Sequence, residues 1–410
     1  MRERQCVPQP EQMNNEVKMA QRIRSVVAHG QGRRSSWLAY HQGRYWFVLG
    51  ILLLGVVTLV AISYEGIVRS GQASMTHGIP SPVIIAAGAF HEYPLPRADS
   101  EVMRPAIDQQ GRIWFGAMGQ NALVAFDPRT RSFQYLTPPH GHHGIMGVQV
   151  AHDNTIWFAE QFANYIGHYF PVTGRYKIYP LPRLTIPDPS HAGRTIALTS
   201  APNELALDAH NNVWFTELNA DRLGKLDPRS EHMWHYPLSS KTSVQTLLPY
   251  GVTVDPQGKV WFTEAGSNRL GRLDPATGAL HLFTVPQSHT LLMEIASDAH
   301  GIIWVTSFTP GLLLRFTPGS GTFTNYTTPF TKGSESSALY GLLVTSAGDV
   351  WVTILAENVI ARLDVAANRF IYYRIPTRGS LPLGLVMDAN HNFWFTCVDN
   401  IGLLQLEKNG

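Results

Sequence analysis

Cysteine is almost absent from this chain, which holds two cysteines in 410 residues, Cys6 and Cys397. The two lie on opposite sides of a long hydrophobic segment, so no disulfide framework is available to the fold. An excess of either charge is missing too, because 32 Lys and Arg against 30 Asp and Glu give a formal net charge of +2. We therefore expect no nucleic-acid partner, since proteins that bind nucleic acid carry a basic field.

Familiar catalytic signatures are also missing. The sequence contains no G-x-S-x-G phrase, no Walker A phrase and no H-E-x-x-H phrase. These phrases would indicate, in that order, a nucleophile-elbow hydrolase, a P-loop nucleotide site and a zinc peptidase. Any chemistry that the chain performs must come from residues outside these motifs.

Charge is entirely absent from residues 45–64, which read YWFVLGILLLGVVTLVAISY. At about 1.5 Å per residue, a helix of this length spans the roughly 30 Å hydrocarbon core of a bilayer. Aromatic residues stand at both ends, and eight Lys and Arg residues precede the segment while only Arg69 lies within twenty residues after it. The positive-inside rule then predicts a single-pass transmembrane signal-anchor helix in the cell membrane, with a cytoplasmic N-terminus.

Two other interpretations of this segment stay open, a cleaved signal peptide and a buried core helix. A leader of 44 residues is long for a signal peptide and no clear A-x-A site follows it, while a core helix does not suit an otherwise all-β chain. With an anchor, the chain divides into four parts. They are a cytoplasmic basic tail (1–44), the transmembrane helix (45–64), a stalk or linker (65–88) and a domain outside the cell (89–410).

The domain after the stalk consists of seven repeats of one short phrase. The phrases read GRIWFGA, NTIWFAE, NNVWFTE, GKVWFTE, GIIWVTS, GDVWVTI and HNFWFTC. Their tryptophans lie 43, 57, 47, 43, 47 and 43 residues apart, at Trp114, Trp157, Trp214, Trp261, Trp304, Trp351 and Trp394. A period of roughly 40–45 residues with a strand-like core is typical of a β-propeller with one blade per repeat. We therefore predict an all-β, seven-bladed β-propeller.

Each repeat divides into four short strands, and the ends of the repeat region indicate how the ring closes. The seventh repeat runs out of chain after a third strand at residues 401–406. Residues 90–96, FHEYPLP, resemble the fourth strands of other repeats, such as RYKIYPLP at 175–182. This N-terminal strand is expected to complete the last blade, which removes an open sheet edge.

The phrase W-F-T-E, followed by N/D-x-[IL]-G-[RK]-[IL] and a fourth strand ending in Y-P-L-P, resembles the streptogramin B lyase (virginiamycin B lyase) family. The resemblance covers about residues 89–408 and is closest at 213–226 and 260–273. It implies a seven-bladed propeller and, for the lyases, a metal-dependent elimination that opens a cyclic depsipeptide antibiotic at its ester bond. It also implies catalytic histidines in the loops that enter the last two blades, eleven residues before the tryptophan.

In this chain no histidine occupies any of those seven positions. They hold Met103, Met146, Asn203, Tyr250, Met293, Tyr340 and Leu383. The favoured interpretation is therefore a ligand- or partner-binding propeller without the classical lyase residues. The alternative is a virginiamycin B lyase-like carbon–oxygen lyase with a rearranged site.

The ligand site is expected at the mouth of the central channel, on the face formed by the inter-blade loops and the loops between second and third strands. The residues assigned to it are Glu160, Asn203, Glu204, Glu217, Tyr250, Glu264, Glu294 and Tyr340. The excess of carboxylates predicts a cationic or metal-bridged ligand, and Glu217 and Glu264 are expected to lie outside the core. The opposite face, built from D-P-x-T-G turns, is expected to offer less to a partner.

Three of these carboxylates, Glu160, Glu217 and Glu264, follow W-F in successive blades and could bind a divalent cation such as Mg²⁺. Alternatively, their recurrence marks a repeat feature that orients its own loop. His140, His142 and His143 could ligate zinc or copper, or could simply be solvated loop residues.

The longest interval between tryptophans contains an insertion at 183–202, with His191 and Arg194, and this insertion is expected to form a wall of the site. The expected partners are the membrane, through the anchor, and a small-molecule or cell-surface ligand at the propeller face. A monomer is expected, and the identity of the ligand does not follow from the sequence.

Overall fold

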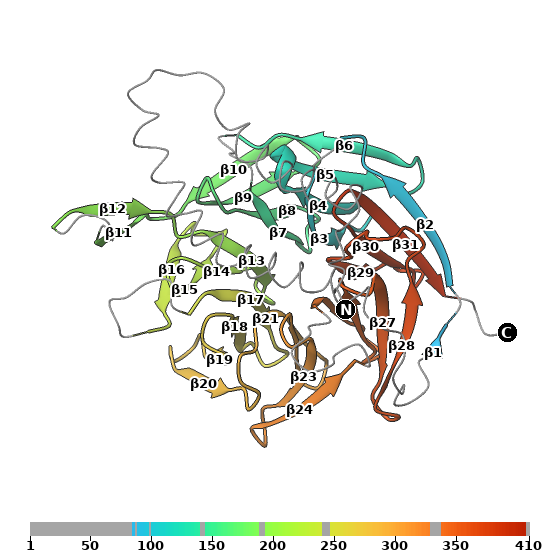
Figure 1. The fold of residues 1–410 in the computed structure, drawn as a ribbon. Helices are drawn as coiled ribbons and strands as arrows, with labels where there is room; N and C mark the ends of the chain where they lie inside the picture. Colours follow the sequence, from blue (N-terminus) through green and yellow to red (C-terminus); the bar gives the residue numbers. More distant parts are fainter. Residues whose placement is uncertain are drawn as a thin grey trace, which may run out of the picture. The chain divides into compact units, whose positions relative to one another are not determined.

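The computed structural model describes residues 84–86, 88–97, 100–139, 144–187, 193–239, 247–328 and 338–406, and these form a seven-bladed β-propeller (Figure 1). Seven sheets surround a central axis, and the first strand of each blade lies nearest to that axis. The prediction of an all-β, seven-bladed propeller is confirmed.

Blades one to six each contain four antiparallel strands that follow the chain outward from the axis. Blade one comprises β3 (Val102–Ile107), β4 (Ile113–Ala117), β5 (Ala122–Asp127) and β6 (Ser132–Leu136), with the short 3-10 helix η2 (Met118–Gln120) between β4 and β5. Blade two comprises β7 (Ile145–Val150), β8 (Ile156–Glu160), β9 (Tyr165–Phe170) and β10 (Arg175–Pro180). Blade three comprises β13 (Pro202–Leu207), β14 (Val213–Glu217), β15 (Arg222–Leu226) and β16 (Met233–Pro237).

The second half of the ring repeats this order. Blade four comprises β17 (Pro249–Val254), β18 (Val260–Glu264), β19 (Arg269–Leu273) and β20 (Leu280–Thr284). Blade five comprises β21 (Leu292–Ser297), β22 (Ile303–Ser307), β23 (Leu312–Thr317) and β24 (Thr322–Thr327). Blade six comprises β25 (Leu339–Val344), β26 (Val350–Ile354), β27 (Val359–Asp364) and β28 (Arg369–Arg374).

Blade seven is shared between the two ends of the ring. It contains β29 (Leu385–Met387), β30 (Phe393–Thr396) and β31 (Asn400–Leu406), and its outer strand is β2 (Gly88–Pro94), antiparallel to β31. The predicted closure by an N-terminal strand is confirmed. A hydrophobic contact reinforces it, because Trp394 of blade seven packs in one cluster with Phe115 of blade one.

A further short strand, β1 (Ile84–Ile85), pairs in parallel with the outer strand β28 of blade six. The Ala86 N–H also donates to the Tyr372 carbonyl at 2.9 Å. The chain therefore pairs first with blade six, through β1, and then with blade seven, through β2, before it reaches blade one. The last residues of the predicted stalk belong to these sheets.

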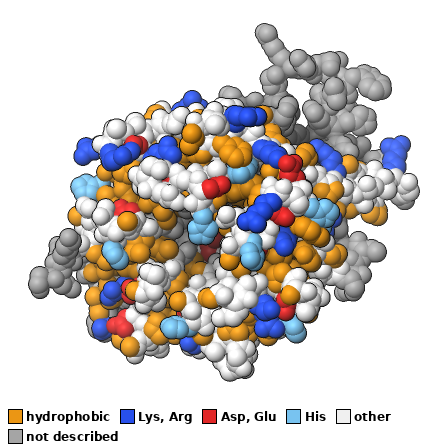
Figure 2. All heavy atoms as spheres, turned by 180° about the vertical axis from the view of Figure 1, so that it is seen from behind, with side chains coloured by type: hydrophobic (Ala, Val, Ile, Leu, Met, Phe, Trp, Pro, Cys, Tyr) orange, Lys and Arg blue, Asp and Glu red, His pale blue; other side chains and the backbone are white. Residues whose placement is uncertain are grey.

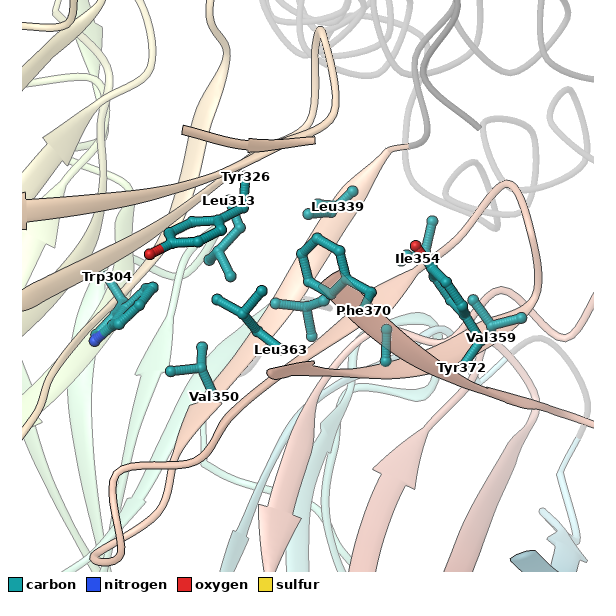
Figure 3. Close-up of a cluster of buried hydrophobic side chains, with 12 residues drawn as sticks. Trp304, Leu313, Tyr326, Leu339, Val350, Ile354, Val359, Leu363, Phe370 and Tyr372 are labelled. Atoms are coloured by element: carbon teal, nitrogen blue, oxygen red, sulfur yellow. The ribbon is translucent and has the colours of Figure 1, made fainter. Parts of the chain in front are cut away.

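The blades are held together by large side chains on both faces of each second strand. Trp304 of blade five packs in one cluster with Val350 and Leu363 of blade six (Figure 3). The residue after each tryptophan faces the other way, so that Phe158 of blade two packs with Trp114 of blade one. Because neither face of a blade meets water, each interface removes apolar surface from solvent on both sides.

The glycine of the repeated phrase is explained by the phenylalanine that precedes it in the blade. A Cβ at Gly224 would lie 2.0 Å from the Phe215 ring, and one at Gly271 would lie 2.0 Å from the Phe262 ring. In blade five, where Val305 replaces the phenylalanine, a leucine pairs with it at the glycine position. The W-F and L-G phrases are thus two halves of one packing arrangement within a blade.

The described part of the chain contains no helix of the length and apolar character needed to cross a membrane. The predicted tail (1–44), the predicted transmembrane helix (45–64) and the stalk up to residue 83 lie outside the described residues. Their assignment stays a prediction.

Candidate functional site

The first strand of each of blades one to six carries a bulge where it begins. In blade three the pairing of β13 with β14 shifts register between Pro202 and Leu205, and the other five blades show the same shift. Bulges re-aim side chains and are common beside functional sites. The two bulged residues stand eleven and ten positions before the blade tryptophan, so the bulges present the positions that the family resemblance marks.

The threonine of the W-F-T phrase ties each bulge to the next blade. Thr216 Oγ1 accepts a hydrogen bond from the Glu204 N–H at 3.1 Å and donates one to the Tyr250 carbonyl at 2.9 Å. Equivalent threonines make the same two bonds in blades four, five and six. The inner strands are therefore linked at the height of the bulges, which fixes the side chains that point to the axis.

Five bulge residues from five blades contact one another at the axis. Arg104 Nε lies 2.6 Å from Glu204 Oε2 and donates a hydrogen bond to Glu294 Oε1. The guanidinium carbon lies 5.1 Å from the centroid of the Tyr250 ring and 5.7 Å from that of Tyr340. The two tyrosine hydroxyls are 2.6 Å apart. We call these five residues the axial cluster.

The axial cluster is almost closed to solvent, and its ion pairs leave some buried polar atoms, such as Oε2 of Glu204, without a hydrogen bond among the described residues. Arg104 is 7% exposed, and the side chains of Glu204 and Glu294 are 6% and 12% exposed. The terminal nitrogens of Arg104 have no hydrogen-bond acceptor among the described residues, and the two tyrosine rings provide cation–π contacts to the guanidinium instead. One face of the molecule is hollowed near its centre, with charges of both signs scattered around the hollow (Figure 2).

Burial dominates the titration of the axial cluster. It raises the pKa of Glu204 from 4.5 to about 7, although the charge of Arg104 opposes this, and it raises the pKa of Glu294 in the same direction. Burial acts to lower the pKa of Arg104, but Glu204 and Glu294 outweigh it and the pKa is raised. The pKa values of both tyrosines are raised by burial too. Arg104 therefore stays protonated, while Glu204 titrates near neutral pH.

Sequence reasoning predicted four of these five residues and missed Arg104. The histidine motif marks the position eleven residues before each tryptophan, whereas the charges stand one residue later. That later position reads Arg104, Gly147, Glu204, Gly251, Glu294, Gly341 and Gly384 in the seven blades. Glycine is favoured there because the next blade approaches closely, as at Gly341, where a Cβ would lie 2.0 Å from the Leu383 carbonyl oxygen. At this position of the repeat, four blades have glycine and three have a charged residue, and these three exceptions are the signal that could have identified the cluster.

The three carboxylates that follow W-F are enclosed within their own blades. Glu160, Glu217 and Glu264 are all 0% exposed, so the expectation that Glu217 and Glu264 lie outside the core is wrong. Glu217 accepts a hydrogen bond from Arg222 at 2.6 Å and lies 2.6 Å from His235 Nδ1. The sequence pattern hid this outcome because the basic partner stands five residues later, in the third strand.

Burial and the hydrogen-bonded partners of Glu217 and Glu264 act in opposite directions on the pKa values of these two glutamates. Burial acts to raise the pKa of Glu217, but His235 and Arg222 outweigh it and the pKa is lowered. For Glu264 burial prevails over Ser267 and Arg269, and the pKa is raised. Arg269 Nε donates to Glu264 at 2.7 Å. Both glutamates act in the structure as repeat features that join the second and third strands of one blade.

The carboxylates do not form a site for a divalent cation. Within the described ranges, no three His, Cys, Asp or Glu side chains are grouped so that they could hold a metal ion. At the axis, the place of a cation beside Glu204 and Glu294 is taken by Arg104. The prediction of a cationic or metal-bridged ligand rests on an excess of carboxylates at the channel mouth. Four of these carboxylates, Glu204, Glu217, Glu264 and Glu294, have basic partners within the protein, and the ligand stays a prediction.

The remaining predicted residues serve the scaffold or lie outside the description. Asn203 is fully buried, and its side-chain amide donates to the Tyr250 carbonyl at 3.1 Å. The histidines at 140, 142, 143 and 191 fall outside the described residues. The insertion forms a two-stranded hairpin, β11 (Leu184–Pro187) and β12 (Thr195–Leu198), which projects from the ring between blades two and three (Figure 1).

Comparison with known proteins agrees with this architecture. The family model described as the virginiamycin B lyase family matches residues 193–409. A streptogramin B lyase structure is similar with a TM-score of 0.68 and 25% identity, over 78% of this chain and 98% of the other. No curated protein matches the chain.

Two further solved structures extend the comparison at the level of the fold. A catalytically inactive virginiamycin B lyase from Staphylococcus aureus with quinupristin has a TM-score of 0.67 and 23% identity, over 78% of this chain and 100% of the other. The extracellular domain of a protein described as a one-component system of B. thetaiotaomicron has a TM-score of 0.58 and 16% identity, over 77% of this chain and 39% of the other.

Proposed function

Starting from the virginiamycin B lyase family, to which this chain belongs, we propose a membrane-anchored propeller outside the cell that binds a ligand and lacks the lyase reaction. The ligand is a small molecule or a cell-surface group, held at the face formed by the inter-blade loops. The axial cluster closes the channel beneath that face.

One observation supports binding over catalysis. The positions where the family resemblance implies catalytic histidines hold Tyr340 and Leu383. The hydroxyl of Tyr340 bonds to that of Tyr250 at 2.6 Å. The adjacent carboxylates, Glu204 and Glu294, are paired with Arg104. A general base must be free to accept a proton from the substrate, and a Lewis-acid metal must have free ligands. The axial cluster provides neither a free general base nor free ligands for a metal ion.

The proposed anchoring and location are supported by residues 45–64, which carry no charge, and by the basic residues before them. The similarity to the extracellular domain of a one-component system fits a propeller outside the cell. Such an arrangement would present the ligand face to the surroundings, with residues 1–44 available on the other side of the membrane.

A second candidate function is a lyase with a rearranged site. The observation in its favour is Glu204, because burial raises its pKa to about 7, the range in which a general base works best at neutral pH. Arg104 opposes this role, since a carboxylate held by a guanidinium is a weaker base.

Quinupristin separates the two candidates. The full chain in detergent micelles is incubated with the antibiotic and Mg²⁺, and the products are read by mass spectrometry. We expect saturable binding of intact antibiotic and no linear product. Linearisation by the wild type that disappears in Glu204→Gln would establish the lyase and contradict the proposal.

Protease treatment of intact cells tests the proposed topology. We expect an added protease to remove the propeller from the cell surface while a tag fused before residue 1 stays protected. Protection of the propeller in intact cells, with digestion after lysis, would place it in the cytoplasm.

A further inference from the structure

A groove opens between blades four and five, at the end of the blades opposite to the axial cluster. It has a volume of about 340 Å³ and is lined by the turns that follow β17, β21 and β23. Pockets that bind small molecules commonly measure about 300–1,000 Å³. The groove is therefore large enough for a compact metabolite, on the face that the sequence suggested would offer less to a partner.

Arg272 lines this groove and forms no ion pair with any of the described residues. Its guanidinium carbon lies 5.6 Å from the centroid of the Trp261 ring, and its Nε is buried without a hydrogen-bond partner. The other basic chain, Lys259, already donates to Asp274 at 2.8 Å. Stacking on a ring orients the guanidinium while its terminal N–H groups stay available.

The carboxylate that lines the groove is already occupied. Asp255 Oδ1 accepts the N–H groups of Gln257 at 2.9 Å and Lys259 at 2.8 Å, and its Oδ2 accepts the Trp261 Nε1–H at 2.7 Å. These bonds fix the turn and the tryptophan, and they leave the carboxylate little capacity for Arg272. The groove thus contains an oriented cation, Arg272, and a carboxylate, Asp255, whose oxygens already accept hydrogen bonds from the turn and from Trp261.

We propose that this groove binds a small oxyanion, a carboxylate or phosphate group carried by a compact metabolite. Arg272 would hold the anion through the parallel N–H groups that match carboxylate and phosphate geometry. His300 and Thr317, which also line the groove, provide further donors on its blade-five side.

Arg362 of blade six provides a matched control for Arg272. Arg362 occupies the position of Arg272, 6.0 Å from the centroid of the Trp351 ring. The cavity that it lines measures about 110 Å³ and also contains Asp349. This smaller cavity should not bind the same anion, because the Asp349 carboxylate, unlike that of Asp255, accepts no hydrogen bond from the turn or the tryptophan among the described residues.

Isothermal titration of the full chain in detergent micelles tests the proposal, with inorganic phosphate and citrate as separate probes at fixed ionic strength and pH 7. We expect saturable binding of at least one probe, and the one that binds identifies the preferred group. Arg272→Gln should weaken binding at least about tenfold, the equivalent of one charge-assisted hydrogen bond. Arg362→Gln should leave it within about twofold of the wild type.

His300→Ala keeps the test decisive if Arg272→Gln does not fold, because His300 is exposed and its loss should still weaken binding severalfold. Failure of both probes to bind the folded wild type would overturn the proposal. Equal weakening in the Arg272 and Arg362 variants would overturn it as well, since it would indicate nonspecific charge attraction.

Discussion

The axial cluster and the groove between blades four and five both place an arginine against aromatic rings, yet they differ in what surrounds the guanidinium. Arg104 contacts two tyrosines and two carboxylates and is almost fully buried. Arg272 contacts Trp261 and has no carboxylate partner among the described residues. The same residue type is therefore structural where otherwise unpaired carboxylates of other blades surround it, and stays available where the nearby carboxylates already have other partners.

The energetic consequences differ accordingly. A buried ion pair is weak evidence of stabilisation by itself, but removal of one partner leaves an uncompensated buried charge. A partly exposed arginine without a carboxylate partner has little to lose in the folded state. Variants of Arg104 and Arg272 should therefore separate clearly in stability.

Replacement of Arg104 by methionine should have the largest effect. It keeps most of the side-chain volume and leaves Glu204 and Glu294 buried without their cation. We expect a loss of about 3–5 kcal/mol in the free energy of unfolding, measured by urea titration with tryptophan fluorescence. Arg272→Gln should change the same quantity by less than about 0.5 kcal/mol. Similar losses in the two variants would contradict the distinction between the two regions.

Removal of the whole charged set should cost much less than removal of its cation alone. The triple variant Arg104→Met, Glu204→Leu, Glu294→Leu replaces three buried charges by apolar side chains of similar size. Such exchanges are often neutral or stabilising, so we expect most of the loss seen in Arg104→Met to be recovered. A triple variant that is less stable than the single one would show that the carboxylates stabilise the fold without Arg104.

The indole N–H groups of the repeated tryptophans offer a smaller test of what an unsatisfied buried polar group costs in stability. In five blades an aspartate six residues before the tryptophan accepts the indole N–H, as Asp255 does from Trp261. In blade six Thr345 takes that place, and the buried Nε1 of Trp351 has no partner among the described residues. Thr345→Asp should raise the free energy of unfolding by about 1 kcal/mol, and Asp255→Thr should lower it by a similar amount. Destabilisation by Thr345→Asp would contradict this account.

The pH dependence of stability tests the titration of Glu204 within the axial cluster. Because burial raises the pKa of Glu204 to about 7, the folded state binds more protons than the unfolded state between pH 4.5 and 7. Stability from this group is thus lost as pH rises through that range. The stability difference between wild type and Glu204→Gln should fall from pH 4.5 to pH 7, as measured by urea titration at several pH values. A difference that rises over this range would indicate a lowered pKa.

The sequence predicted the ring well because the fold depends on a repeated local pattern. Each W-F phrase requires apolar neighbours on both faces, and residues 90–96 match the missing outer strand. The parallel pairing of β1 could not be predicted, because a two-residue strand carries no periodicity.

The candidate site was harder to predict because it depends on contacts between blades. Tyr250, Tyr340, Glu204 and Glu294 were identified from their place in the repeat. Arg104 could not be connected with them by spacing, since it lies 190 residues from Glu294. The burial of Glu217 depends on Arg222 and His235 in neighbouring strands of the same blade, which the W-F-T-E phrase does not reveal.

The most direct test of the closed axial cluster is chemical rescue of Arg104→Ala. This variant removes the guanidinium and leaves space beside Glu204 and Glu294. The midpoint of thermal unfolding is followed while methylguanidinium is added, with sodium chloride at equal ionic strength as the control. We expect methylguanidinium to raise the midpoint of Arg104→Ala and to leave that of the wild type unchanged. An equal response of both proteins, or no response of the variant, would show that Arg104 is not the cation which the axial carboxylates bind.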